Sequence, residues 1–218
     1  MTDPYQGIEA KYQITKKCLE VLSRSNCLAS FSILTKSHLV ARDINVVKKI
    51  RNISVGFTIT TTDDEVSRLL EGNSPPVSLR LKALDQLNQE GVSTYVCVNP
   101  LLPHFVDNER RLRELFSAIR QSGNREIWLE HINLGGNKLR RIKAVLKKET
   151  PKVIKYFEVA KSEKYKADLN RLLFRILRDY DFEIGGGGII DHKRRVIITN
   201  KANSYKKVKS GWRVEVIM

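Results

Sequence analysis

Four short apolar runs of the sequence are each followed by a segment with helical spacing, and this alternation limits the fold more than any other feature. The runs cover residues 28–34, 54–60, 94–98 and 126–132. Strands separated by a helix and lying about 25 to 40 residues apart are typical of right-handed β-α-β units, which form parallel sheets. We therefore predict an α/β fold, either an open sheet or a partial (β/α) barrel.

Polar residues come directly after several of these runs. Lys36 follows the first, Thr60 and Asp63 lie at the end of the second, and Asn99 follows the third. The carboxyl ends of parallel strands meet at one edge of a sheet, where α/β proteins place their functional groups. We expect a site at this edge, although Lys36 could also be an ordinary solvated cation.

The pattern changes from residue 135 onward. Two helices are predicted, at 138–148 and 162–179, followed by a glycine run and a strand at 196–199. The four glycines lack a following Lys-Ser or Lys-Thr, so we interpret them as a flexible turn rather than a phosphate loop. We predict two regions, a partial barrel at 1–134 and a basic helical and β region at 135–218.

Positive charge is concentrated in the second half of the chain. The net charge is +15, and residues 1–100 carry 12 basic against 10 acidic side chains, whereas 101–218 carry 27 against 14. Such a surface attracts nucleic acid through counterion release. Lys193, Arg194 and Arg195 are candidate contacts with a phosphate backbone. Solvated lysine-rich helices, as in proteins from hot environments, explain the same charge without a ligand.

Other features of the sequence bear on the location of the protein in the cell and on disulfide or metal sites. No apolar run reaches the length of a membrane span, and the first residues are acidic rather than a basic leader, so we expect a cytoplasmic protein. Cys18, Cys27 and Cys97 lie at wide spacings that fit neither a disulfide framework nor a metal knuckle. We expect each to be a small buried hydrophobic residue. The four histidines are scattered, and no metal site is predicted.

Five short motifs, in one order along the chain, resemble those of radical SAM proteins of the spore photoproduct lyase-like branch. The match is dense between Thr2 and Pro103, and it is suggested again near residues 187–192. The five motifs lie within Thr2–Glu9, Thr35–Asp43, Phe57–Thr61, Glu71–Leu81 and Val98–Pro103.

This resemblance implies a (β/α)6 partial barrel in which three cysteines hold a [4Fe-4S] cluster and S-adenosylmethionine is cleaved to a radical. Carried over by motif, Lys36 would pair with the carboxylate of S-adenosylmethionine. Thr58 would hydrogen-bond the same ligand, Thr2 and Asn99 would line its site, and Arg80 is a weaker candidate contact. A zwitterionic ligand at such an edge needs a fixed cation and hydroxyl donors. The resemblance also implies a lyase acting in DNA repair, and it leaves the catalytic residues unknown.

One departure from the family pattern changes the expected activity. The sequence has no Cys-x3-Cys-x2-Cys segment, and three scattered cysteines cannot hold an iron-sulfur cluster. We therefore expect a fragment or subunit of such an enzyme that is inactive without the cluster-binding amino-terminal part. A complementary chain or self-association would cover the open edge of its first strand. The alternatives are a basic nucleic-acid-binding protein on a half-barrel scaffold and a non-functional remnant.

Overall fold

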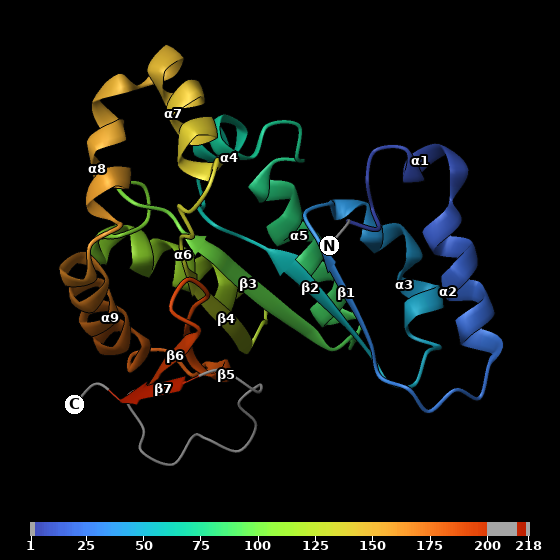
Figure 1. The fold of residues 1–218 in the computed structure, drawn as a ribbon. Helices are drawn as coiled ribbons and strands as arrows, with labels where there is room; N and C mark the ends of the chain where they lie inside the picture. The colour runs from blue at the N-terminus through green and yellow to red at the C-terminus, as the bar shows by residue number, and fades with distance from the viewer. Residues whose placement is uncertain (1–2, 200–212, 217–218) are drawn as a thin grey trace.

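A single sheet of seven strands organises the molecule, in the order β1-β2-β3-β4-β5-β6-β7. The computed structural model describes residues 3–199 and 213–216 (Figure 1). The first five strands are parallel, β6 is antiparallel to β5, and β7 is parallel to β6. The strands are β1 (Phe31–Thr35), β2 (Ile53–Thr58), β3 (Thr94–Leu101), β4 (Glu126–His131), β5 (Glu183–Asp191), β6 (Val196–Thr199) and β7 (Arg213–Val216).

Helices connect the parallel strands, as the alternation in the sequence predicts. In Figure 1, α5 and α6 lie behind the sheet, α1 to α3 lie beside β1, and α7 and α8 rise above the ends of the central strands. The helices are α1 (Glu9–Tyr12), α2 (Ile14–Arg24), α3 (Ile44–Val47), α4 (Asp64–Glu71), α5 (Val77–Gln89), α6 (Glu109–Gln121), α7 (Lys138–Glu149), α8 (Ile154–Val159) and α9 (Glu163–Leu177), with 3-10 turns at His38–Asp43 and Pro151–Val153.

The main core lies between the sheet and its helices. Val55, Phe57, Val96 and Ile127 from the strands are fully buried, as is Phe116 of α6. A smaller cluster under α7 and α8 centres on the buried side chains of Leu146 and Phe157 and reaches Leu69 of α4. This second cluster holds α7 and α8 against the body of the protein. The proposed boundary at residue 134 stays a prediction. The sheet itself continues across this position, since β5 pairs with β4.

The glycine run is strand and not a flexible turn, so that interpretation was wrong. Residues 185–188 lie inside β5. A Cβ atom added to Gly185 would lie 2.1 Å from the ring of Trp128, and one added to Gly188 would lie 2.2 Å from the carbonyl oxygen of Ile198. Glycine is needed here because a tryptophan and a neighbouring strand pack directly against the backbone.

The apolar residues between positions 8 and 24 recur at helical spacing, but the segment forms two helices, α1 and α2, and not one. Gln13 has a φ of 51° in the left-handed region and separates α1 from α2. The carboxylate of Glu9 accepts hydrogen bonds from the backbone amides of Thr15 and Lys16, at 3.0 and 3.2 Å, and so satisfies the first turn of α2. An acidic side chain from the preceding helix therefore takes the place of a local cap.

Candidate functional site

Three of the predicted site residues lie at the carboxyl ends of neighbouring strands. Lys36 comes one residue after β1, Thr58 is the last residue of β2, and Asn99 lies near the end of β3. The register pairs Thr35 with Phe57 and Thr58 with Cys97, which places Lys36 level with Thr58. Adjacent strands are about 4.8 Å apart, so a small ligand can span this edge. The fourth residue, Thr2, lies outside the described residues.

Asp3 fixes the backbone on which Lys36 sits. One oxygen of its carboxylate accepts the hydroxyl of Thr35 at 2.7 Å, and the other accepts the backbone amide of Lys36 at 2.8 Å. The first oxygen also accepts the amide of Tyr5 at 2.9 Å, forming a turn. Charged acceptors make the stronger class of hydrogen bond. The first motif thus acts as a clamp on the end of β1.

Glu71 holds the other end of the same lysine. Its carboxylate lies 3.1 Å from Nζ of Lys36 and 2.6 Å from Nη1 of Arg80, and it accepts the hydroxyl of Thr60 at 2.9 Å. Burial acts to raise the pKa of Glu71, but the charges of Lys36 and Arg80 outweigh it and the pKa lies below its ordinary value. Glu71 is therefore ionised at neutral pH, and it orients the ammonium group.

The Lys36 side chain is 34% exposed, in contrast to Arg80, whose side chain is fully buried. An ammonium group has three donors, so Lys36 can keep Glu71 and still bind a second anion. Arg80 donates to the carbonyl oxygens of Thr58 at 3.0 Å and of Pro75 at 2.7 Å. A ligand could reach Arg80 only by displacing these partners, so we assign it the role of supporting Glu71 and the end of β2.

A second polar group lies along the same edge, at the ends of β4 and β5. The carboxylate of Glu130 is 3.4 Å from Nε2 of His192 and is hydrogen-bonded to Asn99. Burial raises the pKa of Glu130, although His192 opposes this effect. A carboxyl group tuned upward in this way can exchange a proton at a pH closer to neutral. Asn99 thus connects the strand ends that carry Lys36 and Thr58 with this group.

Behind Glu130 lies a buried polar cluster. His131 is hydrogen-bonded through Nε2 to the side-chain oxygen of Asn170 at 2.7 Å, and burial lowers its pKa, so it is neutral at pH 7. Nζ of Lys166 lies 2.7 Å from the carboxylate of Asp191, and both side chains are at most 5% exposed. These contacts join α9 to the ends of β4 and β5.

The predicted basic cluster after β5, Lys193 to Arg195, contains residues in different surroundings. Arg194 is ion-paired with Glu163 at 3.1 Å, and its amide donates to Asp191. Lys193 and Arg195 are exposed, and Arg195 has a φ of 53°. Lys193 lines a cavity together with Lys161 and Lys166. The structure therefore separates three neighbours in sequence into a structural arginine and two accessible cations.

The cysteines do not form a cluster site. Cys18 lies on α2 and Cys27 in the loop after it, and both are exposed, so their predicted burial was wrong. Cys97 is buried in β3, as predicted, and burial raises its pKa to about 12, which keeps the thiol protonated. Among residues 3–199 and 213–216, no three metal-binding side chains are grouped. These residues do not fit a [4Fe-4S] cluster, which needs several thiolates in one place.

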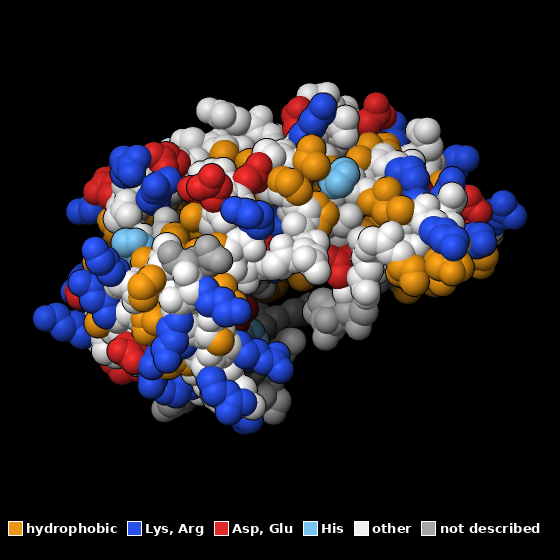
Figure 2. Space-filling view, turned by 90° about the horizontal axis from the view of Figure 1, so that it is seen from above, with side chains coloured by type: hydrophobic (Ala, Val, Ile, Leu, Met, Phe, Trp, Pro, Cys, Tyr) orange, Lys and Arg blue, Asp and Glu red, His pale blue; other side chains and the backbone are white. Residues whose placement is uncertain are grey.

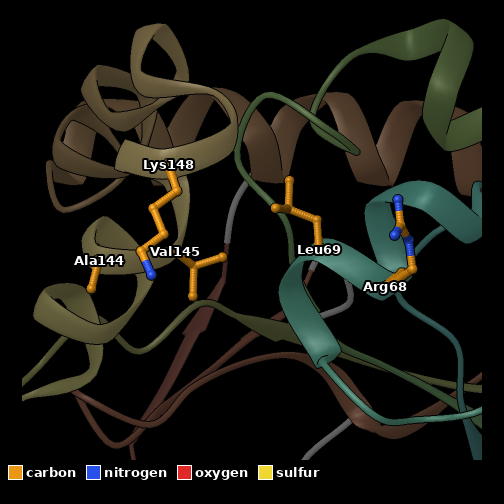
Figure 3. A pocket seen from close by; sticks show the side chains of 5 residues that line it. All are labelled: Arg68, Leu69, Ala144, Val145 and Lys148. Carbon is orange, nitrogen blue, oxygen red and sulfur yellow. The ribbon is translucent and has the colours of Figure 1, made fainter.

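A groove at the seam of α4 and α7 contains none of the predicted site residues. It is lined by Arg68 and Leu69 on one side and by Val145 and Lys148 on the other (Figure 3). Its walls carry two cations and no carboxylate or hydroxyl group.

No helix in the described part of the chain has the length and apolar character needed to span a membrane.

Comparison with solved structures identifies the arrangement of strands and helices. Spore photoproduct lyase, in complex with dinucleoside spore photoproduct, superposes with a TM-score of 0.59 at 17% identity, over 82% of this chain and 56% of the lyase. The chain therefore shares the fold of this lyase over most of its length. SuiB of Streptococcus suis, bound to S-adenosylmethionine, superposes with a TM-score of 0.51 at 11% identity, over 83% of this chain and 36% of SuiB.

The radical SAM partial barrel predicted from the motifs is therefore confirmed as the fold. In sequence, the chain is similar to the uncharacterized protein MJ0683 of Methanocaldococcus jannaschii, with 34% identity over 109 residues. That similarity covers 50% of this chain and 41% of the relative. With 56% of the lyase covered, the chain spans only about half the length of the proteins it resembles. No protein-family model matches the sequence.

Two residues that position Lys36 were not predicted from the sequence. Asp3 and Glu71 both belong to the recognised motifs, but neither was assigned a part in the site. A signal for Glu71 was present, because a carboxylate at the last position of a helix opposes the helix dipole. Such a residue needs a cationic partner, and here it has two.

Proposed function

We propose that this chain forms the S-adenosylmethionine-binding edge of a radical SAM enzyme related to spore photoproduct lyase. The observation that carries the proposal is the clamped, partly exposed ammonium group of Lys36 at the end of β1. Lys36 would bind the ligand carboxylate, and Thr58 and Asn99 would offer a hydroxyl and an amide beside it. In such an enzyme S-adenosylmethionine would supply the radical chemistry, with the cluster held elsewhere. The residues of this chain bind and orient the ligand.

The cluster itself would be held by polypeptide other than these 218 residues. The three cysteines lie on α2, in the following loop and inside β3, which leaves no set of thiolates. Strand β1 pairs only with β2 among the described strands, so one of its edges is open. Exposed apolar side chains lie nearby, including Ile8, Ile14, Val21 and Leu28. An open edge beside apolar surface supports contact with a further strand-bearing segment.

Replacing Lys36 tests the proposal. We expect the chain to bind S-adenosylmethionine weakly in equilibrium dialysis, and Lys36→Gln to lower the affinity by about tenfold, because a charge-assisted hydrogen bond contributes about 1.5 to 3 kcal/mol. Lys49→Gln removes an equal charge from an exposed position and should bind like the unmodified protein. Equal binding by all three proteins would contradict the role of Lys36.

Anaerobic reconstitution with iron and sulfide tests where the cluster is held. We expect this chain alone to give no stable cluster absorbance. A cluster in normal yield would show that the three cysteines suffice after all, and it would refute the need for other polypeptide.

A second candidate function is nucleic-acid binding by α7 and α8. We call residues 138–161 the basic arm; it carries nine basic side chains against two acidic ones. Of the nine, Lys143 alone forms an ion pair with a carboxylate in the described part of the chain, with Glu158. Figure 2 shows Lys and Arg side chains gathered beside a hollow on the side of the molecule where α7 and α8 lie. Unpaired surface cations of this kind bind phosphates.

A salt titration tests this second function. With a fluorescent single-stranded oligonucleotide, we expect the logarithm of the binding constant to fall steeply with the logarithm of salt concentration. Replacing Arg140, Arg141 and Lys147 by Gln should reduce the slope by about 2, since each phosphate contact contributes about 0.7. Replacing the exposed residues Lys11, Lys17 and Lys49 is the matched control. A slope near zero would exclude the function.

A further inference from the structure

A cavity of about 280 Å³ lies between the ends of β4 and β5 and the start of α9. Its wall includes the glycine pair Gly135 and Gly136 and three lysines, Lys161, Lys166 and Lys193. The rest of the lining is largely apolar, with Ile132 and Leu134 among its members. This volume is just below the usual range for ligand sites, so the cavity suits a small group rather than a large ligand.

The three lysines differ in their surroundings. Lys166 is 5% exposed and is held by Asp191 at 2.7 Å. Burial acts to raise the pKa of Asp191, but the hydrogen bond from Lys166 outweighs it and the pKa lies below its ordinary value, so this carboxylate is ionised at neutral pH. Lys161 and Lys193 are exposed, and no carboxylate of the described residues lies within ion-pair distance of either. One lysine is thus part of a rigid wall and two are available to a ligand.

The net charge around the cavity is positive after its acids are counted. Glu163 is 3.1 Å from Arg194 and 3.5 Å from Lys166, so it offsets one of these cations. Asp191 offsets another. Glu158 also interacts with Lys161, but it is ion-paired with Lys143, so these two cancel. The remaining basic groups are Lys161, Lys166, Lys193 and Arg194, and against the two acids they leave a charge of about +2, which suits the charge of about −2 on a phosphate monoester.

The backbone adds to this positive potential. Helix α9, of 15 residues, begins at Glu163, between Lys161 and Lys166, which both line the cavity. The amino end of a helix carries partial positive charge and favours anions. Gly136 has a φ of 58°, and a Cβ atom added there would meet nothing within 4 Å. The glycine loop therefore leaves open space beside the lysines.

We propose that this cavity binds the phosphate group of a phosphate ester. Lys161 and Lys193 contact the phosphate oxygens, Lys166 and its Asp191 partner form the fixed wall, and the apolar lining accepts part of the esterified group. Lysine binds phosphate as a point charge, without the planar geometry that arginine prefers. The proposal does not depend on S-adenosylmethionine binding, because Lys36 and Thr58 belong to other strands. The phosphate can come from a free nucleotide or from a nucleic-acid strand.

Binding of adenosine 5′-monophosphate, measured by calorimetry at physiological salt, tests the proposal. We expect Lys161→Gln and Lys193→Gln each to lower the affinity by at least about 10-fold, since each removes one charge-assisted contact. Lys17→Gln and Lys49→Gln are matched controls, because both lysines are exposed, lie outside the basic arm and the cavity, and carry the same charge. The controls should change the affinity by less than about twofold.

An oligonucleotide with a 5′-phosphate, tested in parallel, distinguishes the two sources. If the two site variants bind the mononucleotide more weakly than the controls do, the ligand is a free phosphate ester. If they bind only the oligonucleotide more weakly, the ligand is the phosphate of a nucleic-acid strand. Equal losses in the site variants and the controls would show a diffuse charge effect and overturn the proposal. Absence of binding by both probes at concentrations up to about 10 mM would also overturn the proposal, because a dissociation constant as weak as about 1 mM would be measurable there.

Discussion

Arg80→Met should lower the free energy of unfolding by about 3 to 5 kcal/mol, which is the usual cost of removing one partner of a buried ion pair. The side chain of Arg80 is fully buried, and it lies 2.6 Å from the carboxylate of Glu71. Without Arg80, the carbonyl oxygens of Thr58 and Pro75 each lose a donor. Urea denaturation followed by circular dichroism measures the change.

Arg68→Met is the matched control, because Arg68 is exposed on α4 and has no carboxylate partner among the described residues. It should change stability by no more than about 0.5 kcal/mol. The double variant Glu71→Met with Arg80→Met should be more stable than Arg80→Met alone, since no buried charge is left unpaired. A loss below about 1 kcal/mol in Arg80→Met would show that the pair is not part of the support under Lys36.

This dependence links the stability of the fold to the candidate site. Glu71 contacts Lys36 and Arg80 at once, and Arg80 contacts the end of β2 at Thr58. Any change that releases Glu71 therefore loosens two residues proposed to bind the ligand. We expect Arg80→Lys, which keeps a charge but not the planar group, to fall between the unmodified protein and Arg80→Met.

The parallel sheet and its functional edge could be predicted because they depend on local patterns. Apolar runs mark the strands, and a parallel arrangement brings Lys36, Thr58 and Asn99 to one edge whatever the details of packing. Gly91 and Gly123 have φ values of 75° and 82° and lie just after α5 and α6, a position and conformation typical of glycine at the end of a helix. These features need only the order of residues along the chain.

The errors arose where the conformation depends on contacts between distant residues. The glycines of β5 are strand because Trp128, from another strand, packs over Gly185. No window of the sequence around the glycines contains that tryptophan. Cys18 and Cys27 were expected to be buried on the basis of residue type, but each faces solvent. Burial is decided by which face of an element finds a partner, and composition does not fix this.

The first motif shows how a recognised pattern can serve structure before chemistry. Asp3 clamps the end of β1, and Tyr5 donates its hydroxyl to Asp43 at 3.1 Å. Arg42 donates two hydrogen bonds to Asp43, both at 2.8 Å, and two to Glu9, at 3.2 Å to its carboxylate and 3.3 Å to its carbonyl oxygen. The motif residues thus join the amino-terminal segment to the turn after Lys36. This network gives the residues of the first two motifs a structural role that does not require a ligand.

Asp43→Ala should lower the free energy of unfolding by about 3 kcal/mol or more, because it breaks this network at its centre. The Asp43 side chain is fully buried and accepts both bonds of the Arg42 fork. Its loss leaves the buried hydroxyl of Tyr5 without its acceptor and the charge of Arg42 with Glu9 alone. Urea denaturation again measures the change.

Asp168→Ala provides the comparison, because it removes a carboxylate that is paired with Arg171 on the exposed face of α9. Exposed pairs of this kind contribute about 0.3 to 0.5 kcal/mol. Asp43→Asn keeps an acceptor for Tyr5 but removes the charge, so it should be intermediate if the ion pair with Arg42 is what stabilises the turn. Equal stability of Asp43→Ala and Asp168→Ala would mean that the network around Asp43 does not hold the amino-terminal segment. Only the hydrogen bonds of Asp3 and the apolar contacts of this segment would then fix it beside β1.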